Sequence, residues 1–170
     1  GTSLDLLTRV NQKIINPYKT GLGFMMLSEY LDKKTIDLSI REYYKKNSLK
    51  NNDPTTYKSI LEIKTNKQSN WFFNDFLNRK SFKDFSIKKI SQNKNKSDFR
   101  LGNLYKSNVP IKLSFIKNNK IINEKWISIK DNDTVLSYDS NKYDFIELNK
   151  NKFITESNYK NNLASFKNYK

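Results

Sequence analysis

The segment NWFFNDFLNRKSFKDFSIKKI, residues 70–90, contains the point at which the spacing of the apolar residues changes. In its first part Phe72 and Phe76 lie four residues apart, a spacing that places both side chains on one face of a helix. From Phe85 onward the period becomes two, with Phe85 and Ile87 separated by one polar residue, as in a β-strand. The segment therefore separates a helical part of the chain from a strand-rich part and predicts an α+β fold.

The helical part, residues 1–83, is predicted to contain five short helices with starts and ends set by capping residues and proline. In chain order we expect a helix that Ser3 caps and that ends before Asn16 and Pro17, a largely apolar helix over residues 21–31, a helix capped by Thr35, a helix that starts at Asp53 and Pro54, and an aromatic helix opened by Ser69. The apolar positions that support them are Leu4, Leu7, Val10 and Ile14, then Ile36, Ile40, Tyr43 and Tyr44, then Tyr57, Ile60 and Leu61, and finally Phe72, Phe73, Phe76 and Leu77.

The strand-rich part is predicted to form a small antiparallel β-sandwich of immunoglobulin-like size. Six or seven short strands are expected, at residues 85–90, 99–105, 111–116, 121–129, 134–138 and 143–148. Residues 117–120 are a hairpin candidate, because Asn118 and Asn119 tolerate the positive φ of a type I′ turn. We therefore expect a helical region over 1–83, a sandwich over 84–156 and a polar tail over 157–170.

The composition of the 170 residues excludes several kinds of active site. The chain has no His and no Cys, so it has no H-E-x-x-H zinc site, no Ser-His or Cys-His pair and no disulfide. It has no apolar run long enough to cross a membrane, so no transmembrane segment is expected. The chain begins at Gly1 and not at Met, and we expect it to belong to a longer protein.

The charge of the chain is strongly positive, with 32 Lys and Arg against 17 Asp and Glu. Only four of the basic residues are Arg, the residue that recognises bases and phosphates best through its planar, bidentate side chain. The Lys residues are spread along the whole chain. We interpret the charge mainly as a solvated surface and expect no specific nucleic-acid partner.

Several blocks of sequence, in this order, are similar to one known family. Residues 17–27 read PYKTGLGFMML and are followed by Tyr30 and Leu31, and residues 70–77 read NWFFNDFL, with Asp84 and Phe85 after them. The strand-rich part adds Asn108 to Leu113, Trp126, Tyr143, Asp144, Glu156, Asn161 and Asn162. Together these blocks resemble the gluzincin zinc aminopeptidases of the aminopeptidase N type, in which a helical catalytic domain is followed by a β-sandwich.

The resemblance implies that the chain is a C-terminal part of such a protein and is not catalytic alone. In the family the zinc ligands precede the tyrosine-glycine segment, so zinc is expected in an upstream catalytic domain of the same protein, and the substrate is expected to be a peptide. Tyr18 matches a tyrosine that donates a hydrogen bond to the oxyanion formed when water attacks the peptide carbonyl. The compartment stays open, with a bacterial periplasmic or secreted protein as one possibility.

Each of these residues also has a purely structural interpretation. Tyr18 can pack at a helix entrance, and Gly21 and Gly23 are more often structural in such a position. The rings of Trp71, Phe72, Phe73 and Phe76, and that of Trp126 in its strand, are expected in the core. The Lys pairs 88/89 and 94/96 are expected to be solvated, and Asp131 and Asp133 to be turn residues with too few oxygens for calcium.

Two other functions stay open at this point. One is a basic module that binds nucleic acid or another polyanion through its lysines. The other is an independent interaction domain that uses an edge of the sandwich.

Overall fold

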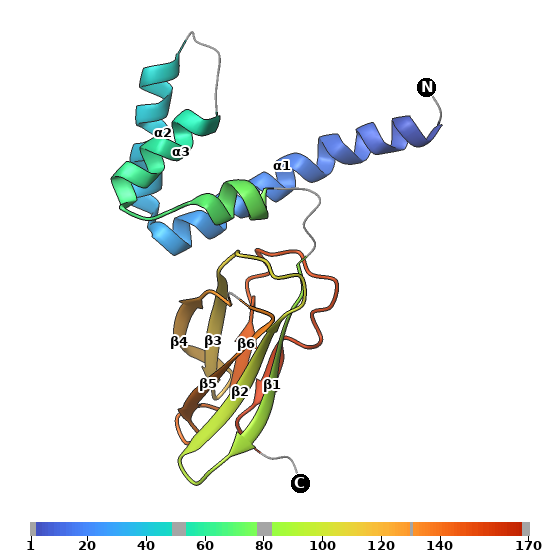
Figure 1. Ribbon diagram of the computed structural model, residues 1–170, viewed down its shortest axis with the longest axis vertical. Helices are drawn as coiled ribbons and strands as arrows, with labels where there is room; N and C mark the ends of the chain where they lie inside the picture. The colour runs from blue at the N-terminus through green and yellow to red at the C-terminus, as the bar shows by residue number, and fades with distance from the viewer. Residues whose placement is uncertain (1–2, 49–53, 78–82, 130, 168–170) are drawn as a thin grey trace. The chain divides into compact units, whose positions relative to one another are not determined.

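The computed structural model of the chain (Figure 1) describes residues 3–48, 54–77, 83–129 and 131–167. The chain forms two compact units, residues 1–78 and residues 79–170. The first unit is helical, and the second contains two antiparallel sheets. The predicted α+β fold, with helices first and a β-sandwich after them, is confirmed.

The described helices of the first unit are α1 (Ser3–Leu31), α2 (Lys33–Asn47), α3 (Pro54–Thr65) and the short π-helix η1 (Trp71–Phe76). The prediction that Pro17 ends the first helix is wrong, because α1 continues through it for 29 residues in all. Pro17 cannot donate to the carbonyl of Lys13, but both residues are exposed, so water can bond to that carbonyl. The first two predicted helices are therefore a single helix. The side chains that the structure describes do not include those of Ser3, Leu4, Leu7, Val10 and Ile14.

The starts of α2 and α3 depend on local chemistry at two positions. Asp32, and not Thr35 as predicted, caps α2: its Oδ1 accepts a hydrogen bond of 2.9 Å from the backbone N–H of Thr35. Thr35 is thus the third helical residue, whose amide a capping side chain typically satisfies. Pro54 begins α3 as predicted, whereas Asp53, its expected cap, lies outside the described residues.

The aromatic segment forms a π-turn where the sequence predicted an ordinary helix. The N–H of Leu77 donates to the carbonyl of Phe72 at 2.9 Å, which closes a wider turn than that of an α-helix. Ser69 precedes this turn, and both its amide and its hydroxyl donate to Glu62 Oε1, at 2.8 and 2.9 Å. These two bonds fasten the start of η1 to α3 and lower the pKa of the Glu62 carboxyl, the backbone bond having the larger effect.

Phe72 lies at the centre of the helical core and is fully buried. Its ring contacts those of Phe24, Trp71, Phe73 and Phe76, with centroids 5.2 to 5.9 Å apart. Trp71 and Phe76 are buried as predicted, whereas Phe73 is only half-buried. The other buried apolar residues of this unit are Met26, Leu27, Ile36, Tyr57, Ile60 and Leu61.

The second unit is a sandwich of a three-stranded sheet, in the order β1-β2-β5, and a four-stranded sheet, in the order β4-β3-β6-β7. The strands are β1 (Phe85–Gln92), β2 (Lys96–Asn103), β3 (Ile111–Lys117), β4 (Lys120–Ile127), β5 (Asp133–Asp139), β6 (Phe145–Leu148) and β7 (Leu163–Ser165). Figure 1 shows β5, β2 and β1 next to one another, with β4, β3 and β6 in the other layer. All six predicted strands are present. The fourth strand pairs with the third, whereas in a constant-type immunoglobulin domain it joins the other sheet.

The β3–β4 hairpin has the predicted turn but places Trp126 on the opposite face from the one predicted. Asn118 and Asn119 have φ values of 50° and 60°, as a type I′ turn requires. A bulge between Phe115 and Ile116 then shifts the register by one residue, which brings Trp126 opposite Lys112. Because such a shift reverses the face of every later side chain, Trp126 is half-buried beside the Lys112 ammonium group and is not a core residue.

The segment from residue 157 onward, expected to be a polar tail, contributes the last strand of the sandwich. Strand β7 pairs antiparallel with β6. Phe166, directly after it, is fully buried and contacts the rings of Phe99 and Tyr143 at 4.7 and 5.5 Å. One aromatic side chain in a polar segment therefore anchors the end of the described chain in the core.

Candidate functional site

Tyr18 lies on a side of α1 that the described part of the helical unit leaves open. Its side chain is 69% exposed, and Met25, seven residues further along the same side of the helix, is 58% exposed. Gly21 lies between them, and a Cβ added there would meet nothing within 4 Å. The phenolic O–H of Tyr18 is thus free to approach a group outside this unit, and a neighbouring backbone can come close at Gly21.

The other side of α1 is tightly packed against η1. A Cβ added at Gly23 would lie 2.6 Å from Cε1 of Phe76 and 3.1 Å from Cε2 of Phe72. Gly23 therefore has the structural role expected of it, since it allows α1 to pack closely against Phe72 and Phe76. Gly21 has no such role. The two glycines mark the packed side and the open side of the same helix.

Further apolar side chains are exposed on α2 and α3. Ile40 and Tyr44, four residues apart on α2 and expected on its buried face, are 44% and 72% exposed. Leu38 on α2 and Ile63 on α3 are exposed as well. Ile40 and Tyr44 share one side of α2, whereas Leu38, two positions from Ile40, lies on another side. Single exposed apolar residues of this kind are ordinary on a protein surface.

The residues of this chain do not suit a catalytic zinc ion. Among the described residues no three His, Cys, Asp or Glu side chains lie close enough together to hold a metal, and the whole sequence has neither His nor Cys. Zinc sites in proteins depend on imidazole and thiolate ligands. Within the described part of the chain, no helix has both the length and the apolar composition needed to cross a bilayer.

The lysine pairs singled out in the sequence lie in two different places. Lys88 and Lys89 line a groove beside β7, whereas Lys94 and Lys96 are exposed around the turn between β1 and β2. Asp133 lies 3.5 Å from the guanidinium of Arg100, so it forms a surface ion pair.

A buried carboxylate, Glu156, holds the segment after β6 against the start of β1. Its Oε2 accepts from the backbone N–H of Phe85 at 2.8 Å, and its Oε1 accepts from the amide groups of Asn149 and Asn162 at 2.6 and 2.8 Å. Burial raises the pKa of Glu156 in spite of these bonds, and the charge of Asp84 acts in the same direction.

Asp84 itself is buried close to this network. Its Oδ2 accepts from the hydroxyl of Ser157 at 2.5 Å, while its Oδ1 has no hydrogen-bond partner among the described residues. The sequence does not predict this network, because Asp84 and Glu156 are far apart in the chain. The only signal was that Asp84, Phe85, Glu156 and Asn162 are all among the residues that carry the family resemblance.

Comparison with known proteins shows a similarity of fold to a solved structure. No protein-family model and no curated protein matches the sequence. Among solved structures, the chain is similar to Legionella pneumophila aminopeptidase A in complex with aspartic acid, with a TM-score of 0.60 at 10% identity. The match covers 72% of this chain and 15% of that chain. Neither unit alone makes up that share, so the similarity includes residues of both and indicates a shared fold.

Proposed function

We propose that this chain forms the end of the helical catalytic domain and the adjoining β-sandwich of a gluzincin-type aminopeptidase, and that it is not catalytic alone. The observation that carries the proposal is the similarity to part of an aminopeptidase, which includes residues of both units and covers only 15% of that protein. In this proposal a zinc-binding domain upstream of residue 1 hydrolyses N-terminal residues from peptides. The chain packs against that domain and forms part of the wall of its cleft.

The exposed apolar side chains of the helical unit support the packing role. Met25 and Ile63 are 58% and 82% exposed, although both have an apolar side chain in a regular helix. Covering such surface stabilises a complex by about 25 cal/mol for each Å² removed from water. A domain that packs against the open side of α1 is also in contact with Tyr18, because Tyr18 lies on that side.

Tyr18 is the residue through which this chain contributes to the reaction in our proposal. A phenol can donate one hydrogen bond to the oxygen on which negative charge develops as the peptide carbonyl is attacked. Such a bond is effective in a cleft from which water is excluded. The exposure of Tyr18 on the open side of α1 supports this role, since a tyrosine that only filled the helical core would be buried.

The test compares Tyr18→Phe with Tyr44→Phe in the whole protein, because Tyr44 is a tyrosine of similar exposure on another helix. Loss of one oxyanion donor lowers kcat by about 10²–10³. We expect that loss for Tyr18→Phe, with KM and the unfolding midpoint nearly unchanged, and no loss for Tyr44→Phe. An unchanged kcat in Tyr18→Phe, or an equal loss in both variants, would overturn the assignment.

A further inference from the structure

Strand β4 forms one edge of the four-stranded sheet. Within the described part of the chain it pairs only with β3, and Figure 1 shows it at the outer end of its sheet. The side chains of residues 120–125 are all exposed, although successive residues of a strand point to opposite faces. Both faces of β4 are therefore accessible, and an exposed edge strand of this kind is one to which a further strand can add.

The register of β3 shows which backbone groups of β4 point toward the free edge. The carbonyl of Lys112 accepts from the N–H of Asn149 at 3.0 Å, so Lys112 directs its backbone groups toward β6. The next residue, Leu113, therefore directs its own toward its register partner in β4, Lys125. Because this direction alternates along a strand, the N–H and C=O of Glu124 point away from β3, and they have no backbone partner among the described residues.

One face of β4 is basic. Lys125 lies opposite Leu113, a fully buried core residue, and so it points to the side of the sheet on which the other layer lies. Lys120 lies opposite Lys117, which shares that face with Leu113. Lys120 and Lys125 are exposed, and neither side chain forms a hydrogen bond or an ion pair with another described residue. This face of the free edge thus has two positive charges available to a partner.

The opposite face of β4 is apolar and has its charge compensated. The carboxylate of Glu124 lies 2.6 Å from Nζ of Lys112 and accepts from the hydroxyl of Ser114 at 3.0 Å. The bulge in the hairpin places Ile121 on the same face as Glu124 and leaves Ile122 as the extra residue. These two isoleucines are 44% and 53% exposed.

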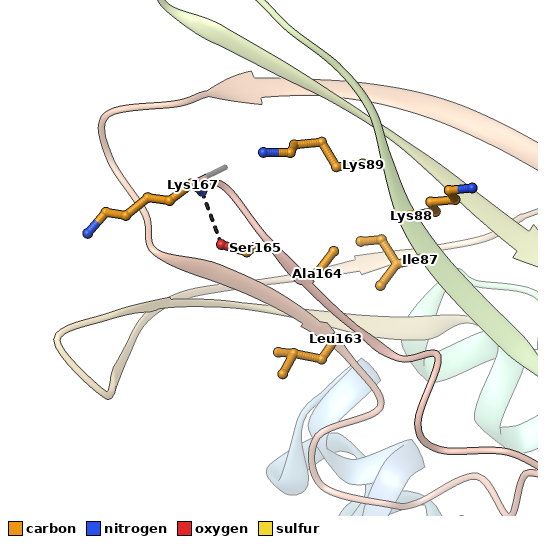
Figure 2. A pocket seen from close by; sticks show the side chains of 7 residues that line it. All are labelled: Ile87, Lys88, Lys89, Leu163, Ala164, Ser165 and Lys167. Carbon is orange, nitrogen blue, oxygen red and sulfur yellow. Dashed lines mark hydrogen bonds between the residues drawn. The ribbon is translucent and has the colours of Figure 1, made fainter. Parts of the chain in front are cut away.

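Two other edge strands of the sandwich do not have the same combination. Strand β7 is covered by β1, since the N–H of Ile87 donates to the carbonyl of Asn161 at 2.8 Å. Figure 2 shows Ala164 of β7 next to Ile87 of β1. Strand β5, the edge of the three-stranded sheet, contains Asp133 and Asp139 and no lysine. An acidic strand is therefore better matched to β4.

We propose that the free edge of β4 binds an extended peptide of alternating acidic and apolar residues, which pairs antiparallel with β4 and places carboxylates beside Lys120 and Lys125 and an apolar side chain beside Ile121. In this mode of recognition the backbone supplies affinity and the side chains supply specificity. A second copy of this chain is a poorer match, because its own β4 would bring the same lysines to the same face. The inference rests on the sandwich and not on the proposed function.

The first test measures the contribution of the two lysines with the 170-residue chain and a labelled nine-residue peptide of alternating Val and Glu. Its controls are the same peptide with Gln in place of Glu, and single-stranded DNA. Exposed ion pairs are individually weak, so the loss of two corresponds to a Kd about five- to tenfold weaker. We expect that loss for Lys120→Gln/Lys125→Gln, and no change for Lys88→Gln/Lys94→Gln, which removes the same charge from exposed positions at β1.

The second test measures the backbone contacts. In an antiparallel pair, residues that bond directly to each other have side chains on the same face, so the Val residues of the peptide are expected to bond to Glu124. N-methylation of the Val amides should therefore abolish binding, whereas N-methylation of the Glu amides should leave it. Amide hydrogen exchange at Glu124 should slow when the Val-Glu peptide is bound, and more than at Lys125, whose N–H is already directed to β3.

Several results would overturn the proposal. These are equal weakening in the two double variants, equal binding of the two methylated peptides, and unchanged exchange at Glu124 with the peptide bound. Tighter binding of the DNA than of the peptide would also contradict it, because the lysines would then act as a site for phosphates and not as part of a strand edge.

Discussion

Replacing the two glycines of α1 one at a time tests how closely this helix packs against η1. Ala is favoured over Gly in a helix by about 1 kcal/mol, and this gain applies at both positions. At Gly21 nothing opposes it, because the new methyl group has no neighbour within 4 Å. We expect Gly21→Ala to stabilise the helical unit by about 0.5–1 kcal/mol.

At Gly23 the same methyl group meets a filled core. It would lie 2.6 Å from Cε1 of Phe76, whereas carbon atoms in contact are normally about 3.5–4.0 Å apart. Phe76 stacks on Phe72 at 5.9 Å and both rings are buried, so neither can move away without disturbing the core. Overpacking of this kind costs about 1–3 kcal/mol. Gly23→Ala should therefore be less stable than Gly21→Ala by about 1–3 kcal/mol.

Urea unfolding followed by tryptophan fluorescence measures this difference. The chain has two tryptophans, one in each unit, so a Trp126→Phe background leaves Trp71 as the reporter of the helical unit. Trp71 is buried and contacts Phe72 at 5.7 Å, so its emission should change when the core opens. Equal stabilisation by Gly21→Ala and Gly23→Ala would refute the packing of α1 on η1.

Two other predictions concern the cores of the two units. Phe72→Ala should lower the free energy of unfolding of the helical unit by about 3–5 kcal/mol, since the ring is fully buried among other rings. Ile63→Ala, at an 82% exposed position, should change this free energy by less than about 0.5 kcal/mol. Similar changes for the two variants in urea titrations would contradict the assigned core. For the sandwich, burial raises the pKa of Glu156 above its ordinary value of 4.5, so between pH 4.5 and the raised pKa the folded state holds more protons than the unfolded state. The free energy of unfolding is therefore expected to fall as the pH rises through this window. Urea titrations at several pH values should show a smaller fall in Glu156→Gln than in the unchanged chain. An equal fall in both would show that Glu156 does not cause the pH dependence.

Much of the fold is predictable from local sequence because it depends on local chemistry. The strands follow the period of two from Phe85 onward, and Asn118 and Asn119 define the hairpin. The sequence also predicts the buried face of α3 and the burial of Trp71, Phe72 and Phe76.

What the sequence does not predict depends on contacts between distant residues or on small shifts in register. The bulge at Phe115 and Ile116 reverses the face of Trp126, and no residue pattern in the strand indicates it. Phe166 is buried because rings from other strands surround it. Glu156 is buried because its hydrogen-bond partners include the amide of Phe85, 71 residues away in the chain. The continuation of α1 through Pro17 depends on that position being exposed to water.

The candidate site was predictable only in part. The resemblance singles out Tyr18, and the structure places it on the open side of a long helix. The groove beside β7 was not foreseen, since Lys89 and Lys167, which line it, are far apart in the chain and come together only because β7 lies beside β1.

The most direct test of the proposed function is the release of p-nitroaniline from aminoacyl p-nitroanilides by the whole protein and by the 170-residue chain, with bound zinc measured in both. We predict that the whole protein binds zinc and hydrolyses these reporters until a chelator removes the metal, and that the 170-residue chain does neither, because it has no imidazole or thiolate ligand. Turnover by the purified 170-residue chain, or a whole protein that neither binds zinc nor cleaves any aminoacyl reporter, would contradict the account.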